Sequence, residues 1–203
     1  MNKGVLLIVS GPSGAGKGTI CSEYMKRRPE TFLSISATSR VPRPGDEEGV
    51  TYFFKTKEQF SKMIENNELF EYAQFCGNFY GTPKAPVLSA IESGRDVILE
   101  IEVQGALQVK EKLPEAVLVF VLPPSPEVLR ERLTGRNTES IEAVNKRIGE
   151  AEREISNSPR YDYIIVNDSL PEATKLLESI SDAEKAKIGN NKDYLKNIWN
   201  LKE

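Results

Sequence analysis

Residues 5–19 read Val-Leu-Leu-Ile-Val-Ser-Gly-Pro-Ser-Gly-Ala-Gly-Lys-Gly-Thr, a short apolar run that breaks into a glycine-rich segment. The apolar run predicts a buried strand, and Ile20, Cys21 and Tyr24 are spaced to share one face of a following helix. A strand, a glycine-rich loop with a lysine, and a helix form the phosphate-binding loop of nucleotide-using proteins. Glycines let backbone N–H groups approach phosphate oxygens, and the helix N-terminus adds partial positive charge. The candidate phosphate-binding residues are Gly11, Pro12, Ser13, Gly14, Ala15, Gly16, Lys17, Gly18 and Thr19.

This loop departs at one position from the general pattern G-x-x-x-x-G-K-S/T. Gly18 follows Lys17 where a hydroxyl residue is usual, and Thr19 comes one residue later. A direct contact between Thr19 and Mg²⁺ therefore does not follow, and binding of the ion through water is an equal alternative. The structural alternative is a glycine-rich turn without a ligand. The register of the glycines and the lysine, between a strand and a helix, favours the nucleotide loop.

The composition excludes several other chemistries. The 203 residues carry a net charge of −3, whereas proteins that bind nucleic acid usually present a basic stripe. There is no histidine, and the two cysteines provide neither a disulfide framework nor a metal-binding spacing. The apolar run before Ser10 is too short for a signal peptide, and no stretch is apolar for long enough to cross a membrane. We therefore expect a cytoplasmic protein that binds small anions.

Apolar runs alternate with helical patterns along most of the chain. We expect strands at 5–9, 33–37, 97–101, 117–122 and 163–166, and helices at 18–27, 104–112, 126–133 and from 171 onward. Continuous apolar strands separated by helices predict an α/β fold of the P-loop NTPase type, with a parallel sheet covered by helices on both faces.

Two stretches interrupt this alternation within a single domain. Residues 36–94 combine short strands with a helix at 57–66, which predicts an inserted mixed α/β subdomain. Residues 135–158 are highly charged and carry only a thin apolar stripe at helical spacing. This makeup is typical of a mobile helical flap, with a solvated surface helix as the alternative. The core is expected to comprise the remaining segments, 1–35, 95–134 and 159–203.

Arg40 and Arg43 lie on a proline-rich loop after the second expected strand. Two guanidinium groups on a stiff loop are suited to bidentate phosphate binding, and Tyr52 and Tyr80 could donate to the same anion. Arginines on a loop are otherwise solvent-facing charges. The nearby nucleotide loop favours the interpretation as ligands.

Glu71 is a single carboxylate among apolar and aromatic residues, where a charge is costly unless donors surround it. Guanine presents two adjacent donors, N1 and N2, which one carboxylate can accept, whereas adenine presents an acceptor at N1. A hydroxyl of Ser36 or Thr82 could serve the guanine O6. The alternative is that Glu71 forms an ion pair with a nearby Lys or Arg.

Two acidic residues, Glu100 and Glu102, end the expected strand at 97–101. A period of two places both on one face, at the carboxyl end of the strand, where ligands gather in open α/β sheets. One acid suits Mg²⁺ binding through waters near Gly18 and Thr19, and the other could reach a base. A pair of solvated acids is the alternative.

Three arginines lie at or on the charged segment: Arg132, Arg136 and Arg147. Arginines on a movable flap can close on a phosphate during its transfer and stabilise the transition-state charge. Asn167 follows the last expected strand and could bind the adenine of a donor nucleotide, although it also fits an ordinary turn.

In combination, these motifs resemble the guanylate kinase family over residues 5 to 177 or so. The matching pieces are the loop at 11–19, Ser36-x-x-x-Arg40-x-Pro42-Arg43, Glu71-Tyr-Ala-Gln-Phe, Gly77-Asn-Phe-Tyr-Gly, Glu100-x-Glu102-x-Gln104-Gly105, Gly135-Arg136 and Val166-Asn-Asp. The family often has Asp where this chain has Glu102. The resemblance implies a core, a GMP-binding subdomain at 36–94 and a lid at 135–158.

The resemblance also implies the reaction ATP + GMP to ADP + GDP with Mg²⁺, and by extension phosphorylation of dGMP. The implied GMP ligands are Ser36, Arg40, Arg43, Tyr52, Glu71, Tyr80, Thr82 and Glu102, and the implied ATP ligands are the loop residues and Asn167. The implied catalytic groups are Lys17, Arg40, Arg43, Arg132, Arg136 and Arg147. The expected partners are these small molecules, not nucleic acid or membrane, and the sequence is compatible with a monomer and with a homodimer.

Three other functions are alternatives to this one. A kinase for AMP or a pyrimidine monophosphate differs at the base contact of Glu71. A non-enzymatic scaffold module usually has a degraded phosphate loop, whereas Lys17 and its glycines are intact here. A GTPase needs the guanine-reading motif N-K-x-D, and Asn145-Lys146-Arg147-Ile148 lacks the Asp.

Overall fold

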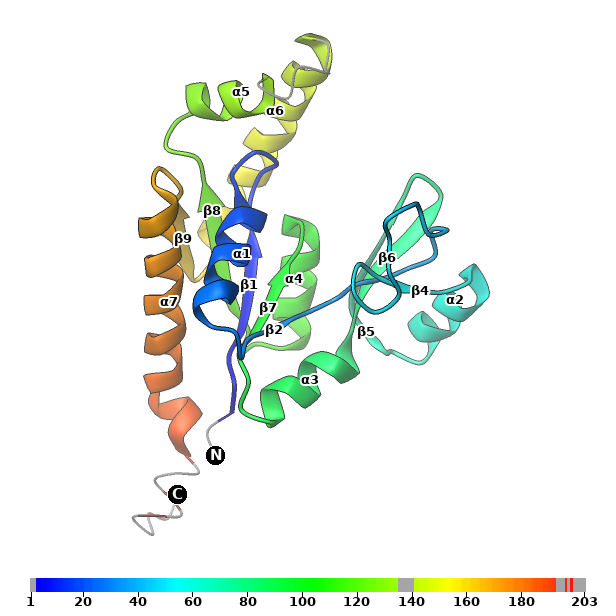
Figure 1. Ribbon diagram of the computed structural model, residues 1–203, viewed down its shortest axis with the longest axis vertical. Coiled ribbons are helices and arrows are strands. Elements are labelled where there is room, and N and C mark those ends of the chain that lie inside the picture. The colour runs from blue at the N-terminus through cyan, green and yellow to red at the C-terminus, as the bar shows by residue number, and fades with distance from the viewer. Residues whose placement is uncertain (1–2, 135–140, 193–195, 197, 199–203) are drawn as a thin grey trace.

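The core of the molecule is a parallel sheet of five strands in the order β2-β7-β1-β8-β9. The computed structural model describes residues 3–134, 141–192, 196 and 198. The core strands are β1 (Leu6–Ser10), β2 (Phe32–Leu33), β7 (Val97–Glu100), β8 (Val117–Leu122) and β9 (Tyr163–Val166). This confirms the expected α/β class with a parallel sheet (Figure 1).

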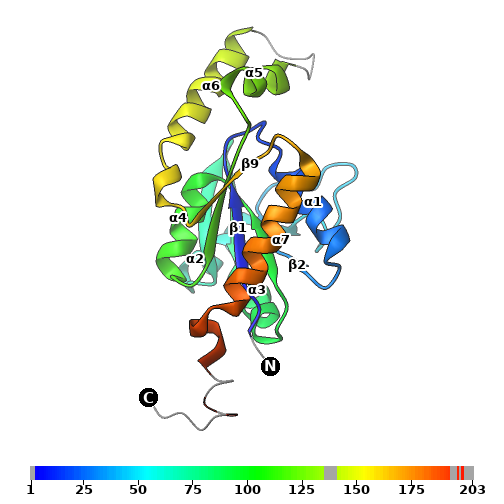
Figure 2. The ribbon, with the colours of Figure 1, turned by 90° about the vertical axis from the view of Figure 1, so that its left-hand side faces the viewer.

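Helices cover both faces of this sheet because β1 is apolar on both faces. Leu7 and Val9 pack in a cluster under α1 (Lys17–Arg27) and α7 (Leu170–Ala186). Leu6 and Ile8 pack in a second cluster, under α3 (Lys84–Glu92) and α4 (Val103–Lys112). Figure 2 shows α1 and α7 in front of the sheet, with α4 behind it.

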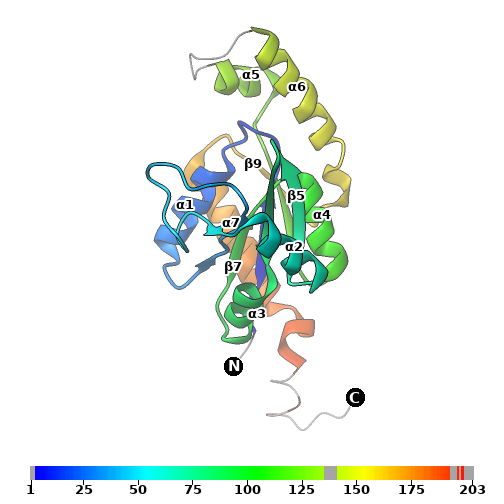
Figure 3. The same ribbon diagram turned by 90° about the vertical axis from the view of Figure 1, so that its right-hand side faces the viewer.

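The inserted subdomain has a second sheet, in the order β4-β3-β6-β5. Its elements are β3 (Ala37–Thr38), β4 (Phe53–Phe54), α2 (Lys57–Glu65), β5 (Leu69–Phe75) and β6 (Asn78–Pro83). Strands β5 and β6 form an antiparallel hairpin, and its turn has positive φ at Cys76 (47°) and Gly77 (76°), as a type I′ turn requires. Figure 3 shows this subdomain in front of the core.

The strand expected at 33–37 is wrong, because this segment is divided between the two sheets. Ser34 N–H still bonds to Ile98 O at 2.9 Å, whereas Ser36 O already accepts Phe53 N–H of the second sheet at 2.9 Å. The chain therefore crosses from β2 to β3 within three residues.

Helix α3 was not expected from the sequence. Pro86 lies in its first turn, where the missing N–H removes no hydrogen bond within the helix. Val87 and Ala90 of this helix are buried with Leu6 and Val97 of the core.

Two helices, α5 (Pro126–Thr134) and α6 (Ile141–Ile155), project above the carboxyl end of the core sheet (Figure 1). They form their own cluster, in which Leu129 and Leu133 pack against Val144 and Ala151. The expected charged helix is therefore present, and its apolar stripe binds α5. Short 3-10 helices follow α6 (Ser158–Arg160) and α7 (Ile188–Asn191). Among the described residues, no helix is long and apolar enough to cross a membrane.

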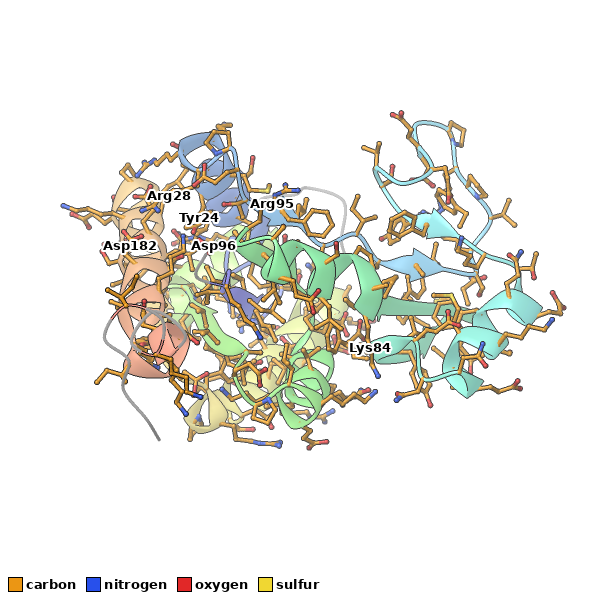
Figure 4. All side chains as sticks on the ribbon, turned by 90° about the horizontal axis from the view of Figure 1, so that it is seen from below. Tyr24, Arg28, Lys84, Arg95, Asp96 and Asp182 are labelled. Carbon is orange, nitrogen blue, oxygen red and sulfur yellow. The ribbon has the colours of Figure 1, made fainter. Side chains whose placement is uncertain are left out.

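A buried carboxylate, Asp96, lies at the amino end of the core sheet, directly before β7, with a side chain that is 3% exposed. It accepts hydrogen bonds from Val5 N at 3.2 Å and Ser181 Oγ at 3.0 Å, and it pairs with Lys185 Nζ at 2.6 Å. Figure 4 shows Asp96 near Tyr24 of α1, close to Asp182 of α7. This network ties α7 to the sheet.

Candidate active site

The glycine-rich loop connects β1 to α1, and two of its glycines cannot be replaced without strain. Gly11 has φ +138°, and a Cβ there would lie 2.2 Å from Val121 O. Gly16 has φ +90°, and a Cβ there would lie 2.3 Å from the side-chain nitrogen of Asn167. The loop therefore needs glycine both for its backbone conformation and for its close contacts with β8 and with the segment after β9.

Lys17 begins α1 and folds back over the loop. Its Nζ donates to Gly11 O at 2.6 Å and to Pro12 O at 3.2 Å. Lys17 lines a cavity of about 700 Å³. The cavity is lined by Ser13, Gly14, Gly16, Lys17, Gly18, Thr19, Glu100, Arg132, Asn167, Asp168 and Leu170.

Glu100, the last residue of β7, lies against Gly18, the glycine that stands where a hydroxyl residue is usual. A Cβ at position 18 would lie 3.3 Å from Glu100 Oε2, so a larger residue would press on the carboxylate. Burial raises the pKa of Glu100, and the field of Lys17 opposes this rise. A carboxylate next to the phosphate loop fits Mg²⁺ bound through water, and Thr19 lines the same cavity.

Helix α6 and the segment after β9 form hydrogen bonds with the phosphate loop. Arg147 of α6 donates to Ser13 Oγ at 2.6 Å, and Arg132 of α5 donates to Asn167 O at 2.9 Å. The side-chain nitrogen of Asn167 donates to Ala15 O at 2.8 Å. Arg132 therefore lines the cavity and Arg147 contacts Ser13 of its wall, while Arg136 lies outside the described residues.

On the inserted subdomain, Arg40 lies over the ring of Tyr52, with its guanidinium carbon 5.4 Å from the ring centroid. The rings of Tyr52 and Tyr80 are 6.1 Å apart and meet edge to face. The side chain of Arg43 is exposed. The structure thus brings Arg40, Tyr52 and Tyr80 together, with Asp46 as an additional partner of Arg40 at 2.8 Å.

Glu71 of β5 is buried at 7% exposed, and Thr82 Oγ1 donates to its Oε1 at 2.6 Å. Burial raises the pKa of Glu71, and the nearby charge of Glu102 raises it further, while the Thr82 bond and the charge of Lys112 lower it. Among the residues that the structure describes, no Lys or Arg forms an ion pair with Glu71. The alternative of a simple buried ion pair is therefore not supported. The Thr82 hydroxyl, expected at the guanine O6, donates to Glu71 in this structure.

The expectation that Glu100 and Glu102 share one face is wrong. Strand β7 ends at Glu100, and Glu102 is the N-cap residue of α4. Glu100 therefore lines the nucleotide-loop cavity, whereas the charge of Glu102 acts on Glu71. Ser36 lies where the chain enters the second sheet, half-buried.

Three charged residues near the site escaped the sequence analysis: Asp46, Lys112 and Glu154. Glu154 is a half-buried residue of α6. Burial raises the pKa of its carboxyl group, the charge of Lys17 opposes this rise, and the charge of Glu102 adds to it. Only Asp46 had a usable signal, because Pro-Gly-Asp after an arginine is typical of a tight turn.

Side chains suited to binding anions lie in two groups, one on the core and one on the inserted subdomain, which is the arrangement of a P-loop phosphotransferase that acts between two nucleotides. The family model for guanylate kinase matches residues 3–184. The chain is 51% identical to the guanylate kinase of Desulfitobacterium hafniense over 92% of this chain and 94% of the relative. It is 54% identical to that of Carboxydothermus hydrogenoformans over 92% of each chain.

The structure is also similar to the crystal structure of guanylate kinase from Anaplasma phagocytophilum, with a TM-score of 0.76 and 30% identity over 100% of this chain and 98% of that one. The chain belongs to the guanylate kinase family, and it is an enzyme of that family.

Proposed function

We propose that the enzyme binds GMP on the inserted subdomain at 36–94 and ATP on the phosphate loop, beneath a lid at 135–158 on a core formed by the remaining residues. The reaction is that of its family, in which ATP phosphorylates GMP to GDP. The observation that carries the assignment of the base site is Glu71. It is a buried carboxylate with a raised pKa and a single hydroxyl donor, so two guanine N–H donors would complete its hydrogen bonding.

The remaining GMP contacts follow from what surrounds Glu71. Glu102 adds a second acceptor for the base, and Ser36 and Thr82 supply hydroxyls near it. Arg40, Arg43, Tyr52 and Tyr80 take the phosphate of GMP, because the arginines offer paired N–H donors and the phenols offer single ones. dGMP differs at the ribose, which none of these contacts is assigned to bind, so it is a substrate as well.

On the ATP side, the backbone of residues 11–19 cradles the phosphates, and the ammonium of Lys17 exchanges its carbonyl partners for phosphate oxygens. The side chain of Asn167 lines the cavity, where it contacts adenine. Its nitrogen keeps its hydrogen bond to Ala15 O. When bound, Mg²⁺ neutralises charge on the phosphate that is transferred. Glu100, with Gly18 and Thr19 beside it, holds the ion through waters.

Phosphoryl transfer between two phosphates requires no strong base, because the GMP phosphate is already an anionic nucleophile. This agrees with a chain that has no histidine. Lys17, Arg132, Arg136 and Arg147 supply positive charge to the transition state, with Arg40 and Arg43 holding the acceptor. Closure of the lid on the subdomain excludes water, which would otherwise accept the phosphoryl group. We place the enzyme in the cytoplasm, because its substrates are nucleotides and because both cysteines are free thiols.

The test is an ADP-release assay with GMP, AMP, CMP and UMP as acceptors at equal concentration. We expect kcat/KM for GMP to exceed that for each of the others by about 10⁴-fold. A base without two adjacent N–H donors leaves at least one carboxylate oxygen of Glu71 without a hydrogen bond. Comparable rates with AMP would overturn the assignment of Glu71 to the base. ATP hydrolysis at the same rate with and without GMP would overturn the proposed transfer.

A further inference from the structure

A tight turn places an acidic side chain beside the first arginine of the phosphate site. Residues Arg43-Pro44-Gly45-Asp46 form a turn in which Asp46 N donates to Arg43 O at 2.9 Å and Gly45 has φ +90°. Proline at the second position and a positive-φ glycine at the third are the residues that a type II turn requires. The turn folds the Asp46 carboxylate back over the loop that begins at Arg40.

One oxygen of that carboxylate connects the two arginines. Asp46 Oδ2 accepts Arg40 Nη2 at 2.8 Å and the backbone N–H of Arg43 at 2.7 Å. The Arg40 and Asp46 side chains are only 11% and 12% exposed. Arg40 Nη1 donates to Val41 O at 3.0 Å, and the guanidinium lies over the rings of Tyr52 and Phe54 at 5.4 and 6.0 Å. The conformation of Arg40 is therefore fixed on several sides.

We propose that Asp46 is a positioning residue that holds Arg40 in the conformation that receives the phosphate of the acceptor nucleotide. The proposal rests on the assignment of Arg40 to the GMP phosphate above. A free arginine side chain loses rotamer entropy when it is immobilised, and the contacts of Arg40 order this side chain before the nucleotide binds.

An opposing effect must be weighed, because Asp46 is itself negative and repels a phosphate. Among the described residues, the contacts to Asp46 and Val41 occupy two of the five N–H donors of Arg40, so three remain for phosphate oxygens. The carboxylate therefore orients the guanidinium and still leaves it N–H donors for a phosphate. If charge alone mattered, neutralising Asp46 would tighten GMP binding. If positioning dominates, the same change weakens it.

The test compares Asp46→Asn and Asp46→Ala with Glu47→Gln, which removes the same charge from an exposed neighbour in the same loop. We expect the Asp46 variants to raise the KM for GMP about tenfold, as loss of a charge-assisted hydrogen bond does, while kcat and the KM for ATP stay near those of the wild type. Asp46→Glu should restore part of the loss, and Glu47→Gln should change the KM little.

Guanosine separates positioning from a loss of subdomain structure, because it carries the base but no phosphate. Its affinity, measured by calorimetry or by competition with GMP, should be the same in the wild type and in Asp46→Asn. Unchanged or tighter GMP binding in Asp46→Asn would overturn the proposal, and so would an equal loss of guanosine and GMP affinity. The proposed function is tested separately with the wild-type enzyme. If the wild type did not phosphorylate GMP, the assignment of the GMP site would be wrong, whatever the Asp46 variants showed.

Discussion

Two buried carboxylates lie beyond opposite ends of β7, and their surroundings differ. Asp96, at the amino end, is 3% exposed and has three donors, one of them the ammonium of Lys185. Glu71, a residue of β5, contacts the segment that follows the carboxyl end of β7. It is 7% exposed, and its one hydroxyl donor is Thr82. A Cβ at Gly105 of α4 would lie 3.2 Å from its Oε2. A buried charge with its donors in place stabilises the fold, whereas one that lacks donors fits a ligand that supplies them.

The largest expected effect tests this contrast at Glu71. Glu71→Gln replaces one acceptor oxygen with an N–H donor, which then faces the donors of guanine. We expect kcat/KM for GMP to fall by about 10³-fold or more, measured by coupled ADP release. The urea midpoint should stay the same or rise, because the change removes a buried charge that has no cationic partner among the described residues.

Glu68→Gln is the matched control, since Glu68 is an exposed acid just before the same strand. It should leave GMP turnover near that of the wild type. Full activity in Glu71→Gln would remove this carboxylate from the site. A collapse of stability in the same variant would show that Glu71 supports the fold as Asp96 does.

The complementary change at the amino end should do the opposite. Asp96→Ala leaves Lys185 without its partner and the buried Val5 N–H and Ser181 hydroxyl without their acceptor. We expect a loss of about 3 kcal/mol in the free energy of unfolding, measured in urea, with kcat/KM for GMP near the wild-type value at 25 °C. The comparison between the two carboxylates fails if this variant unfolds like the wild type, or if folded variant protein is inactive.

A smaller effect concerns pH. Burial raises the pKa of Glu71 above its ordinary value, and only the ionised carboxylate accepts both guanine donors. Guanosine affinity should therefore decrease as pH falls through this raised pKa, by about tenfold per unit below it. Guanosine is the suitable probe because it carries no titrating phosphate, and calorimetry across the weakly acidic range measures the effect.

Stability should respond to this ionisation with the opposite sign. Because the folded state binds the proton more tightly than the unfolded chain, ionisation of Glu71 lowers stability as pH rises through the raised pKa. The advantage of Glu71→Gln over the wild type should thus be absent in acid and develop toward neutral pH. A guanosine affinity that is independent of pH would contradict the raised pKa.

The same contrast explains what the sequence could predict. Glu71 stood out because a lone acid among apolar and aromatic residues demands an explanation, and the phosphate loop stood out through its glycines. Asp96 did not, because Arg-Asp before an apolar strand is an ordinary turn sequence, and its donors come from residues up to 91 positions away. Contacts over such distances depend on the fold and leave no local pattern.

Some errors have a similar physical origin. The apolar pattern at 33–37 does not show which sheet each residue joins, so it predicts one strand where the structure has two, β2 and β3. The alternation that placed Glu100 and Glu102 on one face stopped applying once the strand ended at Glu100. The candidate site residues are proposed from their chemistry alone, whereas their partners, such as Asp46 and Lys112, are seen only in the tertiary structure.

The hairpin turn at Cys76 has a practical consequence. Cys21, the other cysteine, lies in the core and is 2% exposed. Burial raises the pKa of its thiol above the ordinary value, so Cys21 stays protonated and unreactive. Cys76 is exposed at the tip of the hairpin that β5 and β6 form. A maleimide dye would therefore attach at this single point of the unmodified chain, and its fluorescence could report movement of the subdomain as the two nucleotides bind.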